Sequence, residues 1–135
     1  MIQRIQTVLL VLAALANLAV YFTPIYEKAM NDPQLWIGFG LAISLLVAML
    51  LSVISLFLYS DRQNQMVWVK RTAMVQVIAL AFCAGVLFSL GGIGTYLWDE
   101  ALGTALVVLG LILQVMALRF IKKDDELVRS MDRIR

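Results

Sequence analysis

The sequence contains no histidine and only one cysteine, Cys83, among its 135 residues. A single thiol excludes an intramolecular disulfide, and the lack of imidazole excludes a Cys/His zinc site and a histidine-ligated haem. Cys83 stands inside an apolar run, where a thiol is usually a small packing residue rather than a reactive group. We therefore expect no metal ion and no cofactor.

The familiar catalytic motifs are missing as well. The sequence has no Gly-rich phosphate loop and no HExxH, GxSxG or CxxC pattern. The nearest approach is Gly91, Gly92 and Gly94, which lack the lysine and hydroxyl residue that complete a phosphate loop. Asp99 and Glu100 follow, and two adjacent carboxylates in a short turn are most simply solvated. We assign no catalytic residue and expect a protein that is not an enzyme.

Charge is scarce, and four long apolar runs carry none except Arg119, next to the end of the last run. Hydrophobic residues make up 62% of the chain and charged residues 15%, and the mean hydropathy is +0.90. A helix needs about 20 apolar residues to cross a hydrocarbon core, which the run 35–59 exceeds. We predict an all-α integral membrane protein, a four-helix bundle over residues 1–120 with spans at 5–22, 35–59, 72–97 and 101–120. Residues 23–34 and 60–71 are interpreted as loops, and residues 121–135 as a cytoplasmic tail.

Basic residues are divided unevenly between the two expected sides of the membrane. The chain has 11 Lys and Arg residues, and all but Lys28 fall near the N-terminus, in the segment 60–71 or after Leu118. The loops are short, so the positive-inside rule applies to them. It predicts that both termini are cytoplasmic.

Small residues recur at helical spacing in three of the runs. Residues four or seven apart share a helix face, and small side chains let helix backbones approach closely in lipid. We interpret these stripes as helix-packing surfaces within the monomer, with the alternative that one of them faces a partner or a second copy. The stripes are Gly40, Ser44, Ala48 and Ser52; Ala81, Gly85 and Ser89; and Gly103, Gly110 and Ala117.

Three amide residues, Asn17, Gln76 and Gln114, lie inside the apolar runs. Amides can hydrogen bond between membrane helices, at about 0.6 to 2 kcal/mol for each bond. The alternative is that they line a path for a polar solute. We favour the structural interpretation, because charged residues normally accompany a transport path and none lies between the ends of these runs. The same lack argues against a proton-coupled carrier or an ion pump.

The last 15 residues, 121–135, change abruptly to a charged segment, IKKDDELVRSMDRIR. Asp125 and Arg129 have favourable i,i+4 spacing, and Leu127, Met131 and Ile134 fall on one helix face. These patterns predict a short amphipathic helix that continues from the last span, and its mixed charge is unlike a purely anionic-lipid anchor. The candidate partner-docking residues are Arg4, Lys70, Arg71, Lys122, Lys123, Leu127, Arg129, Met131 and Ile134.

The start MIQRIQTVLLVLAAL and the end IKKDDELVRSMDRIR resemble a domain-of-unknown-function family (number 4293) of small four-span inner-membrane proteins, chiefly from Bacteroidota. The resemblance implies a bacterial inner membrane and four spans. It also implies that Arg4, Gln6 and residues 122–135 belong to the family pattern. It supplies no catalytic residue, substrate or cofactor.

The leading functional hypothesis is a non-enzymatic accessory or scaffold subunit of a larger inner-membrane complex. Its partners would be the lipid bilayer and other integral membrane subunits, not nucleic acid, and a homo-oligomer stays open. The alternative is a small homo-oligomeric channel or carrier for a neutral or apolar solute, which would use the three amides and the glycines at 91–94. An enzyme acting on lipid is a weaker third hypothesis, because positioned acid and base groups are not evident.

Overall fold

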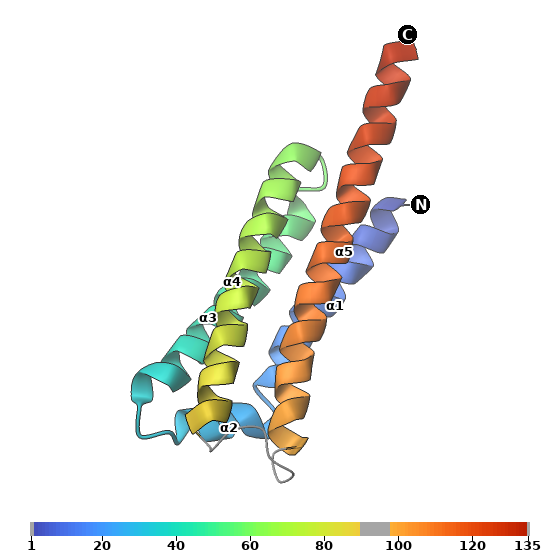
Figure 1. Ribbon diagram of the computed structural model, residues 1–135. Helices are drawn as coiled ribbons and strands as arrows, with labels where there is room; N and C mark the ends of the chain where they lie inside the picture. The colour runs from blue at the N-terminus through green and yellow to red at the C-terminus, as the bar shows by residue number, and fades with distance from the viewer. Residues whose placement is uncertain (1, 90–97, 135) are drawn as a thin grey trace.

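The computed structural model describes residues 2–89 and 98–134, with side chains from residue 5 onward, and these residues form five α-helices. The helices are α1 (Ile2–Val20), α2 (Pro24–Met30), α3 (Leu35–Phe57), α4 (Arg62–Ser89) and α5 (Trp98–Ile134). The four long helices run side by side, and the short α2 lies across one end of them, which we call the α2 end (Figure 1). The start of α1 and the end of α5 lie at the opposite end, which we call the tail end (Figure 1).

The four long helices form a closed ring of contacts. α1 packs on α5, α5 on α4, α4 on α3 and α3 on α1, while α2 contacts α3, α4 and α5. In the described residues, α3, α4 and α5 are each long and apolar enough to cross a membrane. α1 and α2 make a fourth such unit if they count as one span, bent by 53° at the break between them. The all-helical fold predicted from the sequence is confirmed.

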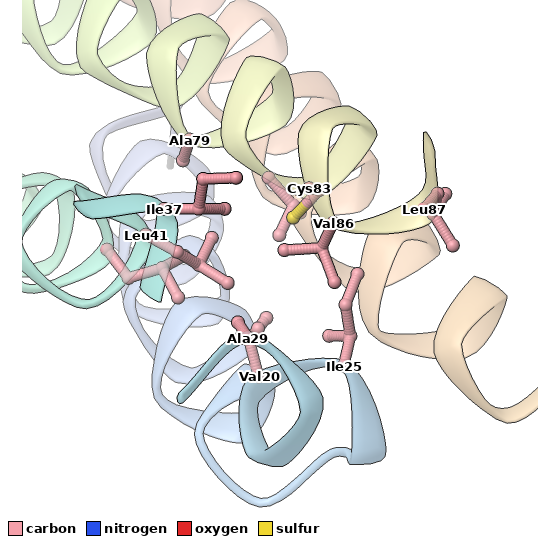
Figure 2. Close-up of a cluster of buried hydrophobic side chains, with 11 residues drawn as sticks. Val20, Ile25, Ala29, Ile37, Leu41, Ala79, Cys83, Val86 and Leu87 are labelled. Carbon is pink, nitrogen blue, oxygen red and sulfur yellow. The ribbon is translucent and has the colours of Figure 1, made fainter. Parts of the chain in front are cut away.

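The main apolar core lies at the α2 end. Ile25 and Ala29 of α2 are fully buried there against Val20, Leu41 and Val86 (Figure 2). Cys83 is buried in the same cluster, as the sequence predicts (Figure 2). α2 therefore closes this end of the bundle by filling the space between the long helices with apolar side chains.

Two segments expected to be loops contain helix, so the loop predictions for 23–34 and 60–71 are wrong. Residues 23–34 include α2, which begins with Pro24, a residue suited to the first turn of a helix because that turn needs no N–H donor there. In the other segment α4 already begins at Arg62. Asp61 caps it: its Oδ1 accepts from the Asn64 backbone N–H at 3.2 Å, and its carbonyl accepts from the Gln65 N–H at 2.9 Å.

The expected tail helix is continuous with the last span. α5 passes from the apolar run 101–120 into the charged segment without interruption and extends beyond the other helices at the tail end (Figure 1). Gly91, Gly92 and Gly94, with the rest of the predicted span from 90 to 97, lie outside the described residues, as does the side chain of Arg4.

Candidate functional site

The three amides singled out in the sequence meet in the centre of the bundle. Asn17 on α1, Gln76 on α4 and Gln114 on α5 are each 0% exposed. Gln76 Nε2 donates to Asn17 Oδ1 at 2.8 Å, and Asn17 Nδ2 donates back to Gln76 Oε1 at 3.0 Å. Gln114 Nε2 donates to the same Gln76 oxygen at 3.2 Å. We call these three residues the amide triad.

Gln76 is the central member of the amide triad. Besides Asn17, its amide nitrogen donates to the Val107 carbonyl of α5 at 3.0 Å. Its two N–H donors and both acceptor positions of its oxygen are therefore in use, which is the full capacity of a primary amide. Gly110 makes room for this arrangement, since a Cβ there would stand 3.1 Å from Gln76 Nε2. The amide triad therefore joins three helices through hydrogen bonds between fully buried side chains.

The small-residue stripes divide between inward and outward faces. The stripes of α3 and α5 face inward. Gly40 packs closely against the ring of Phe82. The buried members are Ser44, Ala48 and Ser52 of α3 and Gly103, Gly110 and Ala117 of α5. The α4 stripe differs. Ala81 is exposed, a Cβ at Gly85 would meet nothing within 4 Å, and the exposed Ser89 donates to Asp32 Oδ2 at 2.7 Å.

The prediction that the acidic pair Asp99 and Glu100 is simply solvated is wrong for Glu100. Asp99 is exposed, but Glu100 is only 2% exposed and forms an ion pair with Lys28 of α2. Asp32 accepts from Ser89 and, at 2.9 Å, from the Gln34 backbone N–H. These two hydrogen bonds hold the pKa of the Asp32 carboxyl below its usual range, since both favour the charged form.

The start of the tail is attached to α4. Arg62 Nε of α4 lies 3.0 Å from Asp124 Oδ2 of the tail. Nearby, α4 is also joined to α3, because Gln65 Nε2 donates to the Ser55 carbonyl at 3.0 Å. The expected pair of Asp125 and Arg129 is present at 3.1 Å. The sequence did not single out Gln65 or Asp124, and the spacing of residues offers no signal for such contacts between helices.

The candidate docking residues fall into three groups at the tail end. Lys70, Lys122 and Arg129 line one groove between α4 and α5, together with Met66, Leu118, Asp125 and Glu126. Arg71 lies over the Trp68 ring at 5.2 Å from its centroid, and Lys123 is exposed beside the groove residues. Leu127, Met131 and Ile134 are 42%, 66% and 87% exposed on the projecting part of α5.

The fold and the buried amides define an all-helical bundle. Among the described residues, three helices are long and apolar enough to cross a bilayer, and α1 with α2 adds a fourth span if the bent pair counts as one. Residues 34–134 match the family described as Domain of unknown function (DUF4293), and the chain belongs to it. The match includes α3, α4 and α5 with the tail. α1 and α2 precede the matched residues, and α1 contains the N-terminal residues on which the resemblance partly relied. No curated protein and no solved structure matched the chain.

Proposed function

We propose that the chain is a multi-pass protein of the bacterial inner membrane, with both termini in the cytoplasm, that acts as a non-enzymatic accessory or scaffold subunit. The observation that carries this proposal is the apolar stripe of the tail. Leu127, Met131 and Ile134 lie along one face of a tail whose other positions are mostly charged, and all three are exposed. A contiguous apolar face outside the membrane is costly in water and is typical of a surface that binds another protein.

The tail is held in a defined position relative to the bundle. The ion pair between Arg62 and Asp124 fixes its first turn against α4, and the apolar stripe begins just beyond. A surface presented on an anchored, continuous helix loses less conformational entropy on binding than a free segment would. This arrangement supports docking rather than a merely solvated tail.

The amide triad favours a structural role over the channel or carrier alternative. That alternative requires Asn17, Gln76 and Gln114 to face a shared solute cavity. The three side chains instead hydrogen bond one another, with all four positions of Gln76 taken. A solute would have to replace these bonds in order to pass, so the contacts support the accessory role.

Affinity purification in mild detergent, with mass spectrometry of the co-purifying proteins, tests the proposal. Deleting residues 122–135 should release the partner while the helices remain inserted. Because a deletion removes charge as well as the stripe, Met131→Glu is the sharper change, and Ser130→Glu is its matched control. Ser130 is the exposed neighbour of Met131 on another face and bonds only the Leu127 carbonyl of its own helix, at 2.7 Å.

The expected result is a stoichiometric membrane complex that Met131→Glu dissociates and Ser130→Glu leaves intact. Equal retention by both variants and by the deleted chain would contradict docking through the tail. Recovery of the wild-type protein alone, at one defined oligomeric mass, would favour the channel or carrier alternative, and solute flux would then be the next assay.

A further inference from the structure

The groove between α4 and α5 at the tail end is a second surface with unexplained chemistry. It encloses about 460 Å³ and is lined by Met66 and Lys70 of α4 and by Leu118, Lys122, Asp125, Glu126 and Arg129 of α5. The apolar run of α5 ends at Phe120 and that of α4 begins at Thr72. The groove therefore straddles the boundary between the apolar and the charged parts of the bundle.

The α5 side of this α4–α5 groove changes character in a fixed order. Leu118, Lys122 and Glu126 follow one another at intervals of four residues, so they share a helix face at steps of about 6 Å. From the membrane outward, the order is apolar, then cationic, then anionic. Lys70 adds a second cation from α4, across the groove.

Three of the charges in the α4–α5 groove are not neutralised within it. Asp125 and Arg129 pair with each other. None of the ion pairs among the described residues includes Lys70, Lys122 or Glu126. Two cations beside an apolar floor, followed by a carboxylate on the water side, form a surface complementary to an amphiphile with a phosphate and then an ammonium group.

We propose that the α4–α5 groove binds a zwitterionic aminophospholipid of the phosphatidylethanolamine type. Its acyl chain lies on Leu118 and Met66, its phosphate between Lys70 and Lys122, and its ammonium group donates hydrogen bonds to Glu126. A purely anionic headgroup would bring no cation to pair with Glu126, and a choline headgroup has no N–H to donate. The inference rests on the membrane placement proposed above and is independent of the accessory role and of the tail stripe.

Native mass spectrometry of the delipidated full-length protein in detergent tests this inference. The probes are dioleoyl phosphatidylethanolamine, phosphatidylcholine and phosphatidylglycerol, each added at the same concentration. Lys122→Ala removes a groove cation, and Lys123→Ala, at the adjacent exposed position that does not line the groove, is the matched control. Glu126→Gln removes only the charge of the carboxylate.

The wild-type protein should retain phosphatidylethanolamine in preference to the other two lipids. Lys122→Ala should lower that retention about fivefold, the contribution of one basic residue near a membrane surface, and Lys123→Ala should not. Glu126→Gln should weaken phosphatidylethanolamine binding and strengthen phosphatidylglycerol binding.

Three results would overturn the proposal. Equal or tighter retention of phosphatidylglycerol by the wild type would make the groove a simple anionic-headgroup site. Equal effects of Lys122→Ala and Lys123→Ala would mean that general electrostatic attraction, not the groove, retains the lipid. Retention of no phospholipid at all would mean that the groove is not a lipid site and would favour a protein partner. None of these results depends on whether the tail binds a protein, so a failure of this proposal is distinguishable from a failure of the accessory role.

Discussion

Replacing Gln76 with leucine tests whether the amide triad holds the bundle together. Leucine keeps an apolar side chain of similar reach in the same place but can neither donate nor accept a hydrogen bond. The change removes four bonds that Gln76 makes, to Asn17, Gln114 and the Val107 carbonyl. All of them cross between helices, so their loss acts on tertiary packing and not on any single helix.

The expected loss is about 2 kcal/mol of unfolding free energy, taking about 0.6 kcal/mol for each of the four bonds between membrane helices. That energy corresponds to an increase of about 30-fold in the unfolding equilibrium constant. Asn17 and Gln114 then keep buried donors and acceptors without partners, which adds to the loss because an unpaired buried polar group is costly.

The measurement is the free energy of unfolding in mixed micelles, from a denaturing-detergent titration. Thr72→Val is the matched control. Thr72 is also on α4 and 0% exposed, but its hydroxyl donates only to the Trp68 carbonyl of its own helix, at 2.8 Å. Such a bond within one helix contributes little to tertiary stability. If Gln76→Leu destabilises the protein no more than Thr72→Val does, the amide triad is not what joins the three helices.

Two further predictions concern the α2 end. Gly38→Ala should lower the thermal unfolding temperature of the detergent-solubilised protein, because a Cβ at Gly38 would stand 2.5 Å from the Ala29 carbonyl oxygen and the backbone would have to move. Gly85→Ala is the control: its Cβ would meet nothing within 4 Å, so the unfolding temperature should stay unchanged or rise. Equal effects of the two changes would refute the close approach of α2 to α3. Ser89→Ala should destabilise the protein at neutral pH, because it removes a hydrogen bond that favours ionised Asp32. Because folding lowers the pKa of Asp32 from 3.8, that contribution is fully present above this value and is lost as the pH falls through the lower pKa of the folded state. The thermal unfolding temperatures of the variant and the wild type should therefore converge as the pH is lowered through the acid range.

The long apolar helices were predictable from the sequence because the signal for each of them lies within a single continuous run of residues. The length and hydropathy of a run decide whether it can cross a membrane, whatever its neighbours are. The start of α4 was missed because residues 62–65 and 70–71 are polar or charged, which is typical of a loop between two spans. Arginine, glutamine, lysine and methionine are nevertheless good helix formers, and the Asp61 cap starts the helix there.

The candidate sites were predictable residue by residue but not as arrangements. The sequence shows that Asn17, Gln76 and Gln114 are polar groups in apolar runs, yet their meeting depends on the rotation and register of three separate helices. The burial of Glu100 depends on where α2 places Lys28, and α2 itself was not predicted. Contacts of this kind arise from packing between segments far apart in the chain, which local spacing does not record.

The continuity of α5 has a mechanical consequence. Between Gly110 and Ile134 the helix has neither glycine nor proline, so nothing in its sequence favours a hinge between the bundle and the tail. Residues 121–134 extend about 21 Å past the apolar run at 1.5 Å per residue. A change of about 10° in the tilt of the span would thus displace the far end of the tail by about 4 Å. A rotation of the span about its own axis would turn the apolar face of the tail by the angle of that rotation. The helix can act as a rigid lever that converts small rearrangements inside the bundle into movement at its far end.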